Sequence, residues 1–108
     1  MADDFYVSKR PSDEKVHTLY TAPKLIYMVY AVIANNTAEA NPEYEFYIAP
    51  KGRKYNRNTL YLRSQDLGDY DYDTIAYYIP LGAGTRIGIK SLSAGDLTFT
   101  VWGWSSIP

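Results

Sequence analysis

Apolar and polar residues alternate with a period of two over most of the chain, and this pattern predicts β-strands. The segment EYEFYIAP illustrates it, because Tyr44, Phe46 and Ile48 would share a buried face while Glu43 and Glu45 face outward. No window shows the periodicity of an amphipathic helix. We expect about seven strands, separated by turn residues at the spacing of a β-sandwich.

The last two alternating runs are joined by Ser-Ala-Gly-Asp, where glycine can adopt a positive φ and Asp96 can bond its own backbone. We expect an antiparallel hairpin here. Its apolar face would consist of Ile87, Ile89, Leu97, Phe99 and Val101. The opposite face is polar except for Trp102 and Trp104, which a monomer would expose. An exposed aromatic pair favours contact with a partner.

The predicted fold class is all-β: an antiparallel β-sandwich, jelly-roll-like or immunoglobulin-like. The segment from Leu25 to Ala34 is apolar on both faces, which is typical of a central strand. Residues 1–14 are polar and aperiodic, so we expect an extended, unstructured N-terminal arm before a single domain over residues 15–108. A chain of 108 residues can bury one core but not two.

Composition excludes several classes of protein. The chain has no cysteine, which excludes disulfides, thiolate chemistry and cysteine-bound zinc. Its formal net charge of -1 argues against bulk attraction to nucleic acid or to membranes. The start, MADDFYVSKR, is acidic where a secretion signal is basic, and the longest apolar stretch is about half a membrane span. We therefore expect no membrane partner.

We expect no catalytic residue, bound metal or cofactor. His17 is the only histidine, so it lacks the partners that a metal site or a Ser-His pair needs. Asp69, Asp71 and Asp73 resemble the start of a calcium loop, but the glycine and glutamate that an EF-hand requires are missing. An acidic strand edge is the favoured interpretation of this run, and a looser calcium site is the alternative.

One stretch is strongly charged. The segment KGRKYNRN contains Lys51, Arg53, Lys54 and Arg57, with Tyr55 among them and no acid. Cations interleaved with an aromatic residue are typical of nucleic-acid sites. The overall acidity of the chain instead favours an acidic protein surface or plain solvation, so we expect no nucleic-acid partner.

Several motifs follow one another along the chain: LYTAP, ANNTA, EFYIAPKG, TLYL and IPLGAGTRIGIKSLSAGDLTFTVWG. In this order they resemble small β-sandwich virion proteins of tailed bacteriophages. The resemblance implies a non-enzymatic structural protein, in the first place a capsid decoration (cement) protein that binds and stabilises the head. A neck, tail or fibre accessory subunit is one alternative, and a glycan-binding β-sandwich module that stacks sugars on the tryptophans is another.

The resemblance also implies a place in the virion, after assembly in the bacterial host cytoplasm. Expected partners are the major capsid protein or other virion proteins, and further copies of the chain in a homodimer or homotrimer. The predicted contact residues lie in the arm, the basic segment and the last strand, and are Phe5, Tyr6, Lys51, Arg53, Lys54, Tyr55, Arg57, Trp102 and Trp104.

Overall fold

The computed structural model describes residues 4–23, 27–36, 43–64, 72–92 and 95–105. Over these ranges it contains eight β-strands and no helix, which confirms the predicted all-β class. The strands are β1 (Asp4–Lys9), β2 (His17–Thr21), β3 (Tyr27–Asn36), β4 (Tyr44–Ala49), β5 (Leu60–Ser64), β6 (Tyr72–Leu81), β7 (Arg86–Ser91) and β8 (Leu97–Ser105).

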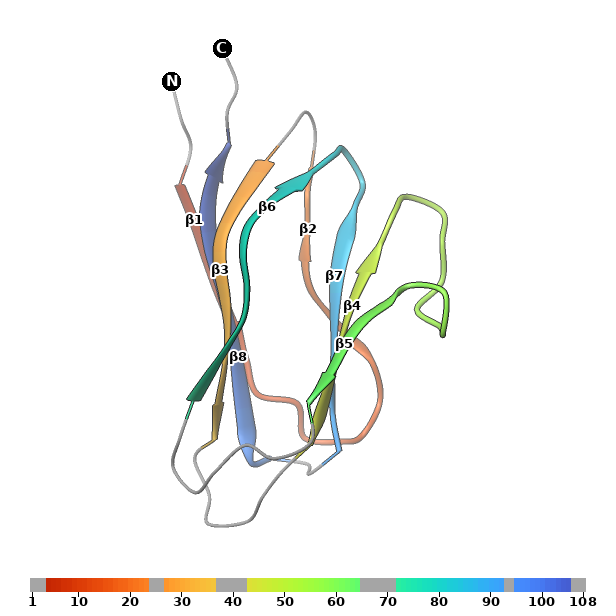
Figure 1. Ribbon diagram of the computed structural model, residues 1–108, viewed down its shortest axis with the longest axis vertical. Coiled ribbons are helices and arrows are strands. Elements are labelled where there is room, and N and C mark those ends of the chain that lie inside the picture. The colour runs from red at the N-terminus through yellow and green to blue at the C-terminus, as the bar shows by residue number, and fades with distance from the viewer. Residues whose placement is uncertain (1–3, 24–26, 37–42, 65–71, 93–94, 106–108) are drawn as a thin grey trace.

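Strands from opposite ends of the chain pair with one another. β1 pairs with β8, β2 with β7, β3 with β6 and β4 with β5, always antiparallel. The pairs β3–β8 and β4–β7 join them into two sheets, β1-β8-β3-β6 (the first sheet) and β2-β7-β4-β5 (the second sheet). The sheets pack face to face (Figure 1). This nested order is that of a jelly roll, one of the two predicted sandwich types.

The core lies between the two sheets and is built from their inward-facing side chains. Tyr44 of β4 and Phe99 of β8 meet edge to face across it, with ring centroids 5.8 Å apart. Both rings are fully buried, and each buried side chain of this size contributes about 1.5–3 kcal/mol. Other fully buried apolar residues are Val29, Val32, Phe46, Leu81, Ile87, Ile89, Leu97 and Val101.

The predicted hairpin between the last two strands is wrong. β7 belongs to the second sheet and β8 to the first, and the connection that contains Gly95 (φ 82) crosses between the sheets. The apolar faces themselves were predicted correctly, because Ile87 and Phe99 are buried. Those faces meet across the core instead of lying side by side. Alternation identifies the buried face of a strand, but two strands can bury that face in either arrangement.

The expectation of an unstructured arm is wrong for residues 4–9. They form β1, an edge strand that pairs with β8 along its whole length. Phe5 and Val7 pack against the core, while Tyr6 and Ser8 are exposed. This alternation covers only six residues beside charged flanking residues. Such a short edge strand produces too weak a pattern to recognise without its neighbour.

β3 occupies the central position that its apolar sequence predicts. It lies between β8 and β6 in the first sheet. Val29 and Val32 on its inner face are fully buried, and Ile33 on its outer face is half-buried. Residues 25–26, at the start of the predicted strand, lie outside the described ranges.

We predict that Phe5→Ala lowers the free energy of unfolding by about 2 kcal/mol, because Phe5 stacks on Tyr20 at a centroid distance of 4.1 Å against the core. Tyr6→Ala is the matched control in the same strand. Tyr6 is 71% exposed, so its loss should cost less than about 1 kcal/mol. Urea unfolding measures both. No effect of Phe5→Ala would contradict the placement of β1 in the folded sandwich.

Candidate binding surfaces

A shallow groove lies on the outer face of the first sheet, where β1, β8 and β3 run side by side. This aromatic groove has a volume of about 570 Å³ and is lined by Tyr6, Ile33, Asn35, Thr100 and Trp102. Tyr6 lies opposite Trp102 between β1 and β8, and Ile33 lies opposite Thr100 between β3 and β8. Directly opposite residues share a face, so strands from both ends of the chain build the groove.

Tyr6 and Trp102 form the aromatic wall of this groove. Their ring centroids are 6.4 Å apart with an interplanar angle of 29°. Tyr6 is 71% exposed. Trp102 and Trp104 are half-buried and not fully exposed as expected, because β8 is flanked by β1 on one side and β3 on the other. Tyr6 is therefore the most accessible aromatic residue of the groove.

Polar groups lie in the groove and on the outer face beside it. The hydroxyl groups of Ser8 and Thr100 are hydrogen-bonded at 2.9 Å, and Arg10 Nε donates to Thr98 Oγ1 at 3.0 Å. Asn35 adds an exposed amide at the groove itself. An aromatic wall beside hydroxyl and amide groups suits a partner that presents both an apolar surface and hydrogen-bonding groups.

Phe5, another predicted contact residue, does not lie on this surface. Its ring faces the core and is nearly parallel to that of Tyr20, with an interplanar angle of 4°. Successive residues of a strand point to opposite sides of the sheet, so Phe5 and Tyr6 cannot both contact the same partner. Within β1, Tyr6 faces the groove and Phe5 packs against the core.

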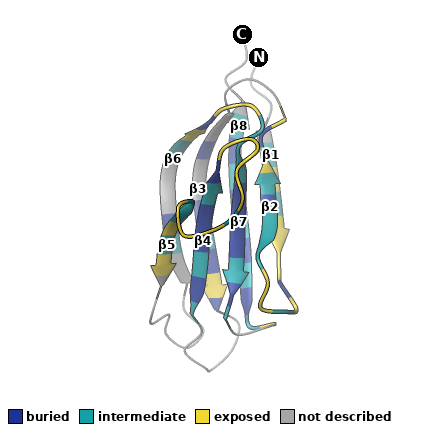
Figure 2. Ribbon diagram, turned by 90° about the vertical axis from the view of Figure 1, so that its right-hand side faces the viewer, coloured by how far each residue is buried: buried dark blue, intermediate teal, exposed yellow. Residues whose placement is uncertain are grey.

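The basic loop, residues 50–59, joins β4 to β5 and folds back over the outer face of the second sheet. Figure 2 shows it as an exposed segment in front of β4 and β7. It begins with a turn in which the Arg53 amide donates to the Pro50 carbonyl at 3.0 Å, with Gly52 at φ 82. Its four cations, Lys51, Arg53, Lys54 and Arg57, are all exposed.

Tyr55 anchors the basic loop to the second sheet. Its hydroxyl is hydrogen-bonded to Thr18 Oγ1 at 2.7 Å, and its ring lies 5.8 Å from that of Tyr47. The ring also covers Gly88, where an added Cβ would lie 2.5 Å from a ring carbon. The Arg86 guanidinium lies 4.7 Å from the ring centroid, a cation–π distance. Tyr55 therefore points toward the sheet and not toward solvent.

Hydrogen bonds inside the loop fix its shape further. Thr59 Oγ1 donates to the Lys54 carbonyl at 2.8 Å and accepts from the Asn56 amide at 2.9 Å. The Arg86 guanidinium donates to the carbonyl of Arg53. A short side chain that bonds the backbone of its own loop replaces the hydrogen bonds that a strand ladder would supply.

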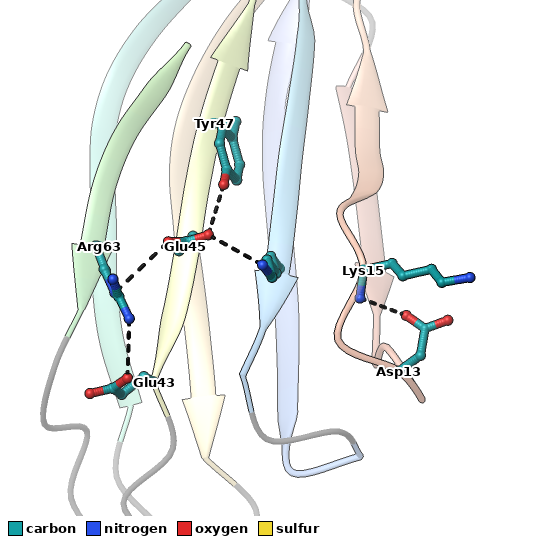
Figure 3. Close-up of polar contacts among 7 residues, drawn as sticks. Asp13, Lys15, Glu43, Glu45, Tyr47 and Arg63 are labelled. Atoms are coloured by element: carbon teal, nitrogen blue, oxygen red, sulfur yellow. Dashed lines mark hydrogen bonds and ion pairs between the residues drawn. The ribbon is translucent and has the colours of Figure 1, made fainter. Parts of the chain in front are cut away.

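An ion-pair cluster occupies another part of the same sheet face (Figure 3). Glu45 accepts a hydrogen bond from the Tyr47 hydroxyl at 2.7 Å and lies 3.8 Å from Arg63 and 3.9 Å from Lys90. Arg63 also pairs with Glu43 at 3.6 Å. Burial, followed by the hydrogen bond to the Glu45 carboxylate, raises the pKa of Tyr47 to about 12. This cluster is balanced in charge and connects β4 to β5 and β7.

His17 is in contact with a carboxylate of the turn before β2. Its Nε2 lies 2.7 Å from Asp13 Oδ1, which also accepts from the Lys15 amide at 3.0 Å (Figure 3 shows the second contact). These two hydrogen bonds, the one with His17 first, hold the pKa of Asp13 below its usual value. The pair ties β2 to the turn before it.

Other candidate chemistry is limited within the described ranges. There, no three His, Asp or Glu side chains lie close enough to hold a metal ion. Asp69 and Asp71 fall outside these ranges, and only the backbone of Asp73, opposite Ala34, is described. The described part of the chain also has no helix able to cross a membrane.

The predicted contact residues fall on opposite faces of the sandwich. Tyr6 and Trp102 lie on the outer face of the first sheet, and the four loop cations lie over the second. Sequence reasoning missed Ile33 and Asn35, because only the register of β3 against β8 brings them to the groove. A glycine inside a strand pattern marks a close approach, and Gly88 carried that signal for the Tyr55 contact.

We predict that Gly88→Ala lowers stability by about 1–3 kcal/mol, because the new methyl group must displace the ring of Tyr55. Gly82→Ala is the control, since an added Cβ there meets no atom closer than 3.9 Å. Chemical denaturation of the two variants measures the difference. Equal stabilities would contradict the packing of Tyr55 on β7.

The raised pKa of Tyr47 predicts a loss of stability in alkaline solution. The unfolded chain releases this proton near the ordinary tyrosine pKa of 10.0 and the folded chain near 12, so the contribution to stability is complete below pH 10 and is lost as the pH rises toward 12. In Tyr47→Phe, the free energy of unfolding should fall less steeply across this window. Urea unfolding at several alkaline pH values tests this, and parallel curves would contradict it.

A scan of the chain against protein-family models finds no match, and searches among curated proteins and among solved structures find none either. The likeness to phage virion proteins therefore stays a prediction.

Proposed function

We propose that this chain is a non-enzymatic structural subunit of a tailed-phage virion, a capsid decoration protein that binds and stabilises the head. The observation that carries the proposal is the aromatic groove. Tyr6 is 71% exposed and stands beside Trp102 on the outer face of the first sheet. Aromatic residues on such surfaces supply much of the free energy of protein association.

The fold supports this function by analogy alone. Jelly rolls occur in viral capsid domains and also in lectins, so the architecture suits both a virion subunit and a sugar-binding module. The groove itself is built from β1, β8 and β3, whose pairing holds the side chains in register. A preorganised surface loses less entropy when a partner binds.

The proposed partners are the major capsid protein, other virion proteins and further copies of the chain in a homodimer or homotrimer. The place of action is the virion, after assembly in the host cytoplasm. In a symmetric dimer or trimer, every copy presents the same surface in the same environment. Such symmetry suits a subunit that binds the repeated lattice of a capsid. Sedimentation of the purified chain distinguishes a dimer or trimer from a monomer.

We predict that Tyr6→Ala and Trp102→Ala each weaken binding to heads assembled without this subunit by about tenfold or more, because an aromatic contact residue is removed. Tyr61→Ala is the matched control: Tyr61 is 57% exposed and lies on β5 of the second sheet. Co-sedimentation with the heads measures occupancy. Full occupancy by both groove variants, with their folds intact, would overturn the proposal.

The composition of the groove also favours a second candidate, a glycan-binding module. Asn35 and Thr100 place an amide and a hydroxyl next to the Trp102 ring, and sugars are bound by stacking on aromatic rings together with such hydrogen bonds. A glycan array separates the two functions. Specific sugar binding that Trp102→Ala abolishes supports the module, while a silent array with retained binding to heads supports the decoration protein.

A further inference from the structure

The four cations of the basic loop are not neutralised within the described part of the chain. Lys51, Arg53, Lys54 and Arg57 are exposed, and none of them forms an ion pair with a carboxylate described here. The cations of the neighbouring cluster differ, because Arg63 and Lys90 are both within ion-pair distance of Glu45. The loop is thus a positive patch, and Arg86 beside the Tyr55 ring adds a further cation for which no ion pair with a described carboxylate is formed.

This patch is held in a defined shape. Tyr55 fixes the middle of the loop to β2 and β7 through Thr18 and Gly88. At the loop's start, the side chain of Lys51 packs against Gly84 so closely that an added Cβ there would lie 2.8 Å from it. A loop that is ordered before binding presents its charges without paying the entropy of ordering them afterwards.

The orientation of Tyr55 indicates which kind of anion the patch suits. Single-stranded nucleic acid is bound by cations together with exposed aromatic rings on which bases stack. The one aromatic residue of this loop is turned onto the sheet, with its hydroxyl bonded to Thr18 and its ring beside Arg86. The chain is also acidic overall, with a pI of about 5.7, where nucleic-acid-binding domains are strongly basic.

We infer that the basic loop is a second docking site, which binds an acidic patch on the surface of a partner protein. The arginines Arg53 and Arg57 can pair with carboxylates through two parallel hydrogen bonds, and the lysines add point charges beside them. The inference goes beyond the proposed function, because this site lies on the opposite face of the sandwich from the aromatic groove. One subunit can therefore contact two neighbours.

The test is an NMR titration of the labelled full chain with a short polyglutamate peptide at low salt. A single-stranded oligothymidylate of equal charge serves as the comparison. We expect amide shifts confined to residues 50–59, which disappear as added salt screens the charges. Polyglutamate should bind at least as tightly as oligothymidylate. Shifts elsewhere or none at all would overturn the site, and tenfold tighter binding of oligothymidylate would overturn the choice of a protein partner.

Matched double variants distinguish the effect of the loop on binding from the effect of the chain's net charge. K54Q/R57Q should weaken the binding of polyglutamate about tenfold. R10Q/K15Q removes the same charge from the connection between β1 and β2 and should leave the binding unchanged. Tyr55→Ala keeps all four cations but releases the loop, and should weaken binding about threefold. Equal effects of the two double variants would overturn the inference. Loss of this site would leave the binding of heads through Tyr6 and Trp102 unaffected.

Discussion

The pairing of β1 with β8 is the interaction on which the rest of the structure depends. It joins the two ends of the chain in one sheet, and the pairs β2–β7, β3–β6 and β4–β5 nest inside it. Among the eight described strands, only β4 and β5 are neighbours both in sequence and in a sheet. Each other pairing must close a long loop before its hydrogen bonds form, so the fold depends on a core that buries both sheets together.

The two outer faces of the sandwich follow from this nesting. On the first sheet, the register between β1, β8 and β3 gathers Tyr6, Trp102 and Ile33 into one groove. On the second sheet, the basic loop joins the adjacent strands β4 and β5 and folds back over the outer face. Gly88 leaves the space that receives the ring of Tyr55. One face therefore presents aromatic surface and the other presents fixed positive charge. We propose that these two faces hold the subunit between two neighbours.

Two polar clusters, one on the second sheet and one in the turn before β2, bring carboxylates together with cations and hydrogen-bond donors. Glu45 is surrounded by Arg63, Lys90 and the Tyr47 hydroxyl, and Asp13 by His17 and the Lys15 amide. In both clusters each carboxylate has a cationic or hydrogen-bonding partner within the chain. Among the residues that the structure describes, the aromatic groove and the basic loop are the surfaces that we propose for partners.

Sequence alone determined the fold class, the buried faces of the strands and the charge of the basic loop, because each depends on the spacing of residues close together in the chain. It did not reveal β1, whose short pattern becomes a strand only beside β8, or the separation of β7 and β8 into different sheets. It placed Tyr55 among exposed cations, whereas the structure turns this ring onto Gly88. Tertiary structure decided these points, since the register and partner of a strand are set by packing between residues far apart in sequence.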